Sequence, residues 1–346
     1  MVANVAAIAL AVPPAKSQKA LWDGYFSQVY AGNRVAPHAW AASGVQTRHG
    51  VVDPTIEDVS QWSTAQRMQR YVAEAMPLGK EAVAAALETA GVAAHDVGLF
   101  TVVSCTGYAT PGLDILLARD LGMSASTQRL MIGHMGCYAA IPALAAVGDA
   151  ATARGLVGVL LCVELVSLHA QPPCGDTEQI ISHALFSDAA AAVVIKPDGA
   201  GLQLVDVVAS TDQTHVEKMT WDITDLGFRM GLSPQVPDVL AAQVGGVVDN
   251  LLLRNGLQRS DVAGWAVHPG GPRILDVVGD RLGLASDALD VSRDTLRDHG
   301  NCSSPTVLMV IEEMLRRRTP DEGDAIVALA FGPGLTLYAA LLRWQS

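Results

Sequence analysis

Aromatic and charged side chains are scarce in this sequence. Of its 346 residues only 5% are aromatic and 17% charged, whereas 50% are hydrophobic. Small apolar residues therefore fill the interior, a composition that suits closely packed helices on a buried sheet. Lys and Arg number 23 against 35 Asp and Glu, and the net charge of −12 argues against a general nucleic-acid binder. An anionic substrate would need a local basic patch.

Cysteine motifs and long apolar runs are also missing. The five cysteines form no CxxC pair and no Cys/His spacing typical of a metal site, so we expect reduced thiols, no metal and a cytoplasmic protein. Apolar residues 4–12 follow no basic segment and stop at Pro13-Pro14, which predicts a first β-strand rather than a signal peptide. No apolar run approaches the length that spans a membrane.

Strand-like and helical segments alternate along the chain, which predicts an α/β fold. Strands are expected at 4–12, 97–103, 128–132, 156–163, 189–195, 265–267 and 325–329, and helices at 18–31, 64–90 and 113–121. Residues 44–50 read as a turn or short strand. This alternation favours sheets rich in parallel strands.

The later half of the chain echoes the earlier half. Ala90-Gly91-Val92 matches Asn255-Gly256-Leu257 at an offset of 165 residues, and a strand, a Gly/Pro loop and a helix follow each. Such a long repeat predicts two similar α/β halves, 1–212 and 213–346. Matching loops of two pseudo-symmetric halves meet at their junction, so Cys137 and Asn301 are expected to face one cleft.

Cys137 is the candidate nucleophile. It follows Gly136 and precedes an Ala-rich segment that reads as a buried helix. A thiol at a helix N-terminus feels the positive end of the helix dipole, which favours its thiolate. The alternative is a buried structural cysteine, because free Cys is often buried.

His268 is the candidate partner of this thiol. It directly follows a predicted strand, in the loop His268-Pro269-Gly270-Gly271. A Cys nucleophile needs a base or a cation beside it, and acyl chemistry needs donors for a developing oxyanion. His268 and the amide of Asn301 could supply both, although a lone loop His is more often structural or solvated.

Four segments together resemble a known family. These are GHMGCYAAIPAL at Cys137, HPGGPRIL at His268, GNCSSPTVLMVIEEM at Asn301 and AFGPGLT at 330–336. In this order, and over nearly the whole chain, they resemble a type III polyketide synthase of the bacterial type, in the chalcone synthase-like branch of the thiolase superfamily. The resemblance implies a duplicated, thiolase-like αβαβα fold in five layers. Related ketoacyl synthases usually place the His before Gln-Ala-Asn and lack the C-terminal loop.

The resemblance also implies residue roles. Cys137 would accept the acyl group, His268 would activate it, and His268 with Asn301 would stabilise the enolate and the oxyanion. Phe186 would stand between CoA tunnel and cavity, Met230 replaces a second gatekeeper Phe, and Trp221 replaces a small Gly facing the cavity. The other expected cavity residues are Cys105, Val166, Leu168, His169 and Ser303, with Thr110 where the family crosses its dimer interface. Arg48 and, more weakly, Arg273 would bind CoA phosphates.

Each of these roles has a simpler alternative. Trp221 and Met230 could be ordinary core residues, and Arg48 a solvated surface side chain.

The activity implied by the resemblance is a decarboxylative Claisen condensation of an acyl-CoA starter with malonyl-CoA, followed by cyclisation. No cofactor is expected beyond the CoA thioesters, and a homodimer is expected. A fatty acyl starter giving a pyrone or resorcinol-type product is the leading hypothesis. Two alternatives stay open: a ketoacyl synthase III-like enzyme that uses acyl carrier protein, and a non-catalytic partner subunit.

Overall fold

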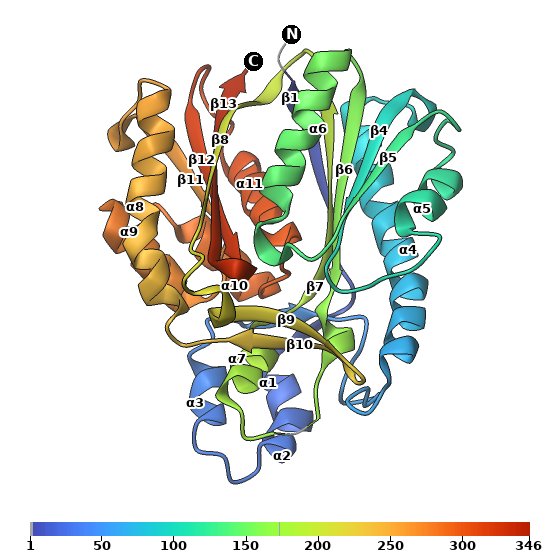
Figure 1. Cartoon of the computed structure of the whole chain (residues 1–346), viewed down its shortest axis with the longest axis vertical. Coiled ribbons are helices and arrows are strands. Elements are labelled where there is room, and N and C mark those ends of the chain that lie inside the picture. The colour runs from blue at the N-terminus through green and yellow to red at the C-terminus, as the bar shows by residue number, and fades with distance from the viewer. Residues whose placement is uncertain (1–2, 173) are drawn as a thin grey trace.

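A nine-stranded mixed sheet forms the framework of the protein (Figure 1). The computed structural model describes residues 3–172 and 174–346. In spatial order the strands are β11 (Val262–Val267), β12 (Ala325–Gly332), β13 (Thr336–Gln345), β8 (Gly201–Thr211), β1 (Asn4–Ala11), β7 (Asp188–Lys196), β6 (Val157–Leu165), β4 (Val97–Val103) and β5 (Gln128–Ile132). Two hairpins lie outside it, β2 (Ala15–Ser17) with β3 (Thr47–His49) and β9 (Met219–Thr224) with β10 (Gly227–Leu232).

The same pairing pattern occurs twice in this sheet. β1 pairs antiparallel with β7, β7 antiparallel with β6, and β6 parallel with β4. In the other half β8, β13, β12 and β11 repeat this series of orientations. The two halves join through β1 and β8, where Asn4 lies opposite Gln203 and Val5 opposite Leu202. The predicted duplication is thus visible in the strand order. β8 pairs along its length with β13, and the boundary at residue 212 stays a prediction.

Parallel strands are fewer than expected. Five strand pairs of the sheet are antiparallel and three are parallel. The expectation of a parallel-rich sheet was wrong because it assumed a helix in every connection. Only the short turn Pro333–Leu335 separates β12 from β13, and a tight turn returns the chain antiparallel to itself.

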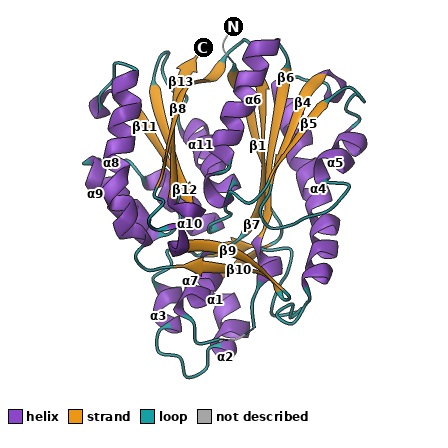
Figure 2. Cartoon of the chain, viewed as in Figure 1, coloured by secondary structure: helices purple, strands orange, loops and turns teal. Residues whose placement is uncertain are grey.

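Helices sandwich the two halves of the sheet in five layers (Figures 1 and 2). The larger ones are α4 (Thr64–Ala90), α5 (Leu113–Leu121), α6 (Ala140–Arg154), α8 (Val236–Arg254), α9 (Pro272–Leu282), α10 (Asp290–His299) and α11 (Pro305–Arg317). α6 and α11 lie between the two halves, α4 and α5 cover one outer face, and α8 and α9 the other. This is the expected thiolase-like five-layer arrangement.

Helix α4 shows why several boundaries were predictable. Ser63 and Gln66 form a reciprocal capping box at its start, and Gly91 ends it in the left-handed conformation with φ 61°. The predicted helix at 18–31 is instead broken into α1 (Gln18–Leu21), a π-helical turn (Trp22–Phe26) and α2 (Ser27–Val29).

Helix α8 is apolar and long enough to cross a membrane, judged by length and composition alone. It packs against β8, β13 and α9 and buries Leu240, Val244, Val248 and Leu251. It therefore serves as a covering helix of the sheet.

The β9–β10 hairpin crosses the end of the two sheet halves, below them in Figure 1. The small helices α1, α2, α3 (Ala36–Ala41) and α7 (Thr177–Leu185) lie on its other side. The candidate site is built between this hairpin and the ends of the central strands.

Candidate active site

Cys137 lies in a tight turn between β5 and α6. The turn is a 3-10 helix, Gly136–Tyr138, and α6 follows at Ala140, so the expected helix begins close to the thiol. Gly136 adopts φ +70°, and a Cβ there would lie 2.8 Å from Cδ of Pro333. Only glycine fits this position, because both the conformation and the close approach exclude a side chain. Cys137 is 5% exposed.

Unusual backbone conformations gather around this turn. Among the described residues, the non-glycine residues with positive φ are His134 (52°), Ser303 (58°) and Leu335 (38°). His134 and Ser303 line a small cavity together with Cys137, and Leu335 ends the turn that begins at Pro333. Strained residues persist where the surrounding structure imposes them, which is common at functional sites.

His268 lies at the end of β11 in the facing half. Its backbone N–H donates to the Leu329 carbonyl at 2.8 Å, and its ring meets Phe331 edge-on with centroids 5.7 Å apart. The side chain is buried, yet neither Nδ1 nor Nε2 has a hydrogen-bond partner among the described residues. Buried polar atoms are usually paired, so an unpaired imidazole is a candidate for contact with a substrate.

Asn301 is held by its backbone and oriented by its neighbour. Its N–H donates to the Leu185 carbonyl at 2.8 Å, and its carbonyl accepts from Ser187 N–H at 2.9 Å. The side-chain Oδ1 accepts from Ser303 N–H at 2.8 Å. Because Oδ1 is engaged, the amide nitrogen is left to donate toward the site.

The three predicted catalytic residues line one cavity. Cys137, His268 and Asn301 share a space of about 290 Å³ with mostly apolar walls, including Phe186 and Met230. Cys137 comes from one half of the duplication and the other two from the second half. The geometry thus brings together the loops that the repeat predicted would meet.

Burial sets the protonation of the thiol and the imidazole. It raises the pKa of Cys137 to about 12, although hydrogen bonds with Ser303 and Asn301 pull this pKa down. Burial lowers the pKa of His268 to about 3. At neutral pH the site therefore holds a thiol and a neutral imidazole. The expected helix-dipole preference for a thiolate is outweighed by desolvation.

A wall of three side chains divides the space around Cys137. Phe186 and Met230 border the Cys137–His268 cavity, a narrow gap of about 20 Å³ beside Cys137, and a larger cavity of about 650 Å³. Trp221 stands between the narrow gap and the larger cavity. Trp221 and Met230 were expected either to line the cavity or to be ordinary core residues. Both descriptions hold, since both residues pack against the core and both border cavities.

The remaining expected cavity residues fall into two groups. Cys105, Val166 and Ser303 line the narrow gap, with Cys105 Sγ 3.8 Å from Ser303 Oγ, and His169 borders the larger cavity. Leu168 differs from expectation, because it is fully buried in the core and absent from the residues that line these three cavities. The Leu168 side chain packs in the core cluster, while its carbonyl accepts a hydrogen bond from Arg67 Nη1.

Thr110 lies on an exposed loop rather than in the cavity wall. Its hydroxyl donates to the Tyr108 hydroxyl at 3.1 Å, and Tyr108 is 74% exposed. Pro111, next in the loop, is exposed as well.

The two candidate CoA residues differ in environment. Arg48 is buried, which excludes the solvated alternative, and Nη1 donates to the carbonyls of His183 and Phe186. Nη1 is thus engaged by the protein interior, while Arg48 also borders the larger cavity, and its role in binding a CoA phosphate stays a prediction. Arg273 is exposed at the border of the Cys137–His268 cavity and pairs with Asp238 at 2.8 Å.

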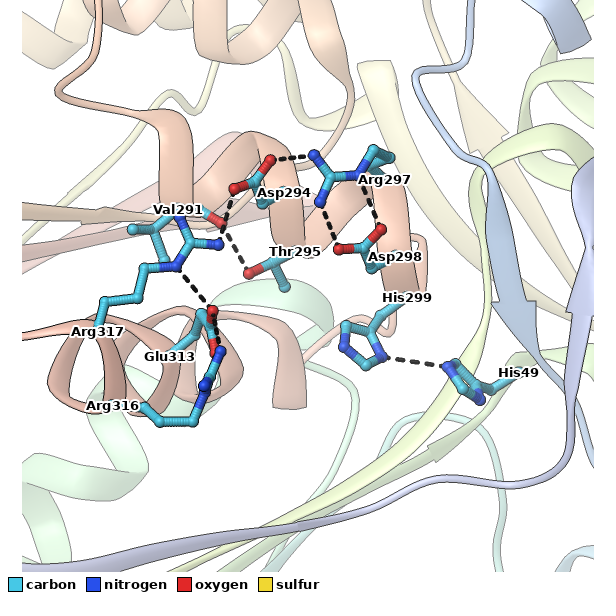
Figure 3. A network of polar contacts seen from close by, with 10 residues as sticks. All are labelled: His49, Val291, Asp294, Thr295, Arg297, Asp298, His299, Glu313, Arg316 and Arg317. Atoms are coloured by element: carbon cyan, nitrogen blue, oxygen red, sulfur yellow. Dashed lines mark hydrogen bonds and ion pairs between the residues drawn. The ribbon is translucent and has the colours of Figure 1, made fainter.

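A polar network braces the helix that leads to Asn301 (Figure 3). Arg317 of α11 pairs with Asp294 of α10 at 2.7 Å. His299, two residues before Asn301, stacks on His49 of β3, with Nδ1 and Nε2 3.1 Å apart. Each exposed ion pair contributes little to the free energy of unfolding. Together these contacts connect α10 to α11 and to β3 and so orient α10.

Glu164 is a buried residue that sequence reasoning missed. Its carboxylate accepts hydrogen bonds from the Ser104, Thr106 and Ser304 hydroxyls and from Cys105 N–H. It therefore ties the Cys105 loop to the Asn301 loop. Burial raises its pKa. The only sequence signal was a single acid at the end of an apolar strand.

Replacing Glu164 with alanine is expected to lower the free energy of unfolding by about 3 kcal/mol, because buried donors lose their acceptor. Urea denaturation measures this change. Glu88→Ala, at an exposed position of α4, is the control and should change the value by less than about 0.5 kcal/mol. Equal effects of the two substitutions would contradict the bracing role.

Comparison with known proteins identifies the family. Residues 41–199 match the family described as chalcone and stilbene synthases, N-terminal domain, and residues 206–345 match its C-terminal domain. The chain belongs to the chalcone and stilbene synthase family. It is a type III polyketide synthase and hence an acyltransferase.

Individual relatives agree with this assignment. The chain is 36% identical over 312 residues to a 1,3,6,8-tetrahydroxynaphthalene synthase of Streptomyces peucetius subsp. caesius, covering 88% of this chain and 82% of the relative. It is 31% identical to the alpha-pyrone synthesis polyketide synthase-like Pks18 of Mycobacterium tuberculosis, covering 88% and 81%. The solved 1,3,6,8-tetrahydroxynaphthalene synthase of Streptomyces coelicolor superposes with a TM-score of 0.94 at 26% identity, over 99% of both chains.

Proposed function

We propose that this polyketide synthase condenses an acyl-CoA starter with malonyl-CoA on Cys137 and then cyclises the product. One observation carries the proposal: Cys137, His268 and Asn301 line a single cavity, and neither ring nitrogen of His268 has a hydrogen-bond partner among the described residues. An imidazole without protein partners can accept the thiol proton and later donate to a substrate oxygen.

The acylation step follows from the protonation states. As Cys137 Sγ attacks the thioester carbonyl, its proton passes to His268, and the CoA thiolate leaves with that proton. Asn301 Nδ2 and protonated His268 supply donors for the oxyanion that forms in between. Proton transfer during the attack avoids a free buried thiolate, which burial disfavours.

The extension step needs no strong base. The malonyl carboxylate leaves as CO2, and the electron pair of the broken bond forms an enolate held by His268 and Asn301. The enolate carbon attacks the acyl-Cys137 carbonyl, a C–C bond forms, and the C–S bond breaks. The Cys137 thiolate that leaves takes up a proton from solvent, which balances the charge lost with the malonyl carboxylate. No cofactor enters this cycle beyond the CoA thioesters.

A fatty acyl starter, giving a pyrone or resorcinol-type product, fits the cavities. The narrow gap beside Cys137 has little room, whereas the Cys137–His268 cavity of about 290 Å³ has mostly apolar walls and offers space for an alkyl chain. Pks18, which is named for alpha-pyrone synthesis, is among the relatives. Mass spectrometry of products from a panel of acyl-CoAs with malonyl-CoA tests the hypothesis. Turnover of aromatic starters alone, or of malonyl-CoA alone, would contradict it.

Replacing Trp221 with glycine should lengthen the product. Trp221 separates the narrow gap from the larger cavity, and its removal joins the two spaces. With octanoyl-CoA and malonyl-CoA, the fraction of products with additional malonyl units should rise about tenfold, equivalent to about 1.4 kcal/mol. Liquid chromatography with mass spectrometry measures it. Unchanged products would remove Trp221 from the control of chain length.

We also propose a homodimer formed at the edge strand β5. Four large apolar residues are exposed around this edge, Tyr108, Ile115, Leu130 and Met131, at 40–74%. An unpaired edge strand with apolar side chains favours pairing with another chain, and Thr110 lies on the adjacent loop.

Replacing Leu130 with lysine should therefore convert dimer to monomer, because a charge would be desolvated in the interface. Analytical ultracentrifugation measures the change. The control is Leu253→Lys on α8, where the leucine is 79% exposed and far from this edge in sequence. A monomeric wild type, or equal effects of the two substitutions, contradicts the proposal.

Two alternatives are separated by one pair of assays. A carrier-dependent enzyme would extend the acyl group with malonyl-carrier protein but not with free malonyl-CoA. A non-catalytic partner subunit would not form an acyl adduct at Cys137. We propose a cytoplasmic location, which fractionation of cells that produce the protein would test.

A further inference from the structure

Two of the three wall side chains, Trp221 and Met230, belong to a hairpin that is separate from the main sheet. In the β9–β10 hairpin, Trp221 lies directly opposite Met230. Directly opposed residues project from the same face of a two-stranded sheet, so the two side chains form one unit of the wall. In the part of the chain that the structure describes, no third strand pairs with the hairpin, so contacts with segments outside the sheet set its position.

His169 connects the hairpin to the Cys105 loop. Its Nε2 lies 2.6 Å from the Thr106 carbonyl, and its Nδ1 lies 2.9 Å from the backbone N–H of Phe228 in β10. A carbonyl only accepts and an N–H only donates, so the ring is the neutral Nε2–H tautomer. Next to this bond, Trp221 Nε1 donates to the Cys105 carbonyl at 2.7 Å. The adjacent carbonyls of Cys105 and Thr106 thus accept hydrogen bonds from Trp221 and His169.

The ring of His169 also packs on both strands of the hairpin. It stacks on Phe228, with centroids 4.6 Å apart and planes 9° apart. It meets Trp221 edge-on at 5.4 Å. His169 therefore acts on the wall through contacts with Trp221 and through the Phe228 backbone.

Arg67 of α4 supports His169 and the hairpin turn from behind. It is fully buried, and its five N–H groups donate to five backbone carbonyls, those of Val59, Ser60, Trp62, Leu168 and Ala170. Gly227, at the hairpin turn, lies directly on it. A Cβ at Gly227 would be 2.4 Å from Cδ of Arg67 and 2.9 Å from Nδ1 of His169. Arg67 thus holds the backbone on both sides of His169, at Leu168 and Ala170, and contacts the hairpin turn at Gly227.

We propose that Arg67 and His169 are positioning residues that hold the Trp221–Met230 pair against the reaction cavity and so limit the number of malonyl units added. This inference rests on the proposed condensing activity. Arg67 does not border the three cavities described above. His169 borders the larger cavity, but both of its ring nitrogens are engaged by Thr106 and Phe228, so neither residue offers a free polar group to the substrate. Their effect passes through Trp221.

The test compares wild type with His169→Gln and Arg67→Lys, using octanoyl-CoA and malonyl-CoA. Gln cannot bridge Thr106 and Phe228 with the rigid imidazole geometry, and the Lys ammonium has three donors for five carbonyls. Each change should shift the product ratio toward longer polyketides by about fivefold, the size of coupling within one hydrogen-bond network. In Arg67→Lys the rate of Cys137 acylation by octanoyl-CoA should change less than about twofold, because Arg67 borders none of the three cavities.

A double substitution separates positioning from general loosening. In the Trp221→Gly background, His169→Gln should no longer change the product ratio, because the group on which it acts is gone. Ile223→Thr on the same hairpin, where Ile223 is 77% exposed, is the control and should leave the ratio unchanged. An unchanged ratio in both single variants, or an equal shift with and without Trp221, would overturn the inference.

A second variant covers the case in which His169→Gln does not fold. Thr64 Oγ1 accepts from Gly227 N–H at 2.9 Å at the start of α4, so Thr64→Ala loosens the same turn. It is expected to shift the ratio in the same direction. Absence of octanoyl-Cys137 in wild type contradicts the proposed function, whereas normal acylation with an unmoved ratio contradicts the positioning role alone.

Discussion

Replacement of Cys137 with alanine is expected to abolish both acylation and product formation. The loss should reach about a thousandfold or more, because removal of a nucleophile leaves only binding and oxyanion stabilisation. Intact-protein mass spectrometry after incubation with octanoyl-CoA reports the adduct, and peptide mapping locates it. The side chain is small and buried in a cavity wall, so the fold should persist.

The chain provides a matched control for this substitution. Cys174 is partly exposed and lies outside the site, so Cys174→Ala should retain full acylation. Cys105 also lines the narrow gap, and burial raises the pKa of its thiol well above the usual value. An octanoyl adduct that persists in Cys137→Ala, for example on Cys105, would contradict the assignment of the nucleophile.

Replacement of His268 with alanine is expected to slow condensation by about 10²–10⁴-fold, the range for loss of a general acid–base group. Stability should change little, since neither ring nitrogen bonds to the described residues and no partner is left unpaired. Release of CO2 from malonyl-CoA measures the condensation step. His38→Ala, at an exposed position of α3, is the control and should retain the wild-type rate.

The pH dependence of acylation distinguishes the role of His268 further. Without the imidazole, the reaction needs the thiolate of Cys137, whose pKa burial raises to about 12. The thiolate fraction then rises about tenfold for each pH unit below that value, and so should the rate of acylation in His268→Ala. In wild type the proton passes to His268 during the attack, so the rate should rise much less between pH 7 and 9. Parallel pH profiles would contradict this role.

Local sequence signals predicted the elements that have clear ends. Helix α4 was predicted from 64 to 90 and is observed at Thr64–Ala90, because a capping box and a left-handed glycine define its limits. The helix predicted at 18–31 contains a π-helical turn, where Gly24 packs on Thr55: a Cβ there would lie 2.9 Å from Cγ2 of Thr55. Such tertiary contact leaves no local signal. The ratio of parallel to antiparallel pairs likewise depends on which connections are short.

The site was predictable where motif and repeat agreed. Cys137, His268 and Asn301 lie in loops with recognisable motifs, and the duplication brings the loops together. Burial of individual side chains was not predictable, which explains the difference at Leu168 and the exclusion of the solvated alternative for Arg48. Arg67 and Glu164 gave weak signals because partners that define their roles, the Leu168 carbonyl for Arg67 and the Ser304 hydroxyl for Glu164, are distant in sequence. These roles depend on the folded arrangement.

The central claim is that an acyl group on Cys137 is extended by malonyl-CoA. The direct measurement incubates the protein with octanoyl-CoA, maps the adduct, then adds malonyl-CoA and follows the adduct, CO2 and product together. The account predicts an octanoyl group on Cys137 that disappears as CO2 and an octanoyl-derived polyketide appear. An adduct that persists after malonyl-CoA is added, or a product formed equally well by Cys137→Ala, would contradict it.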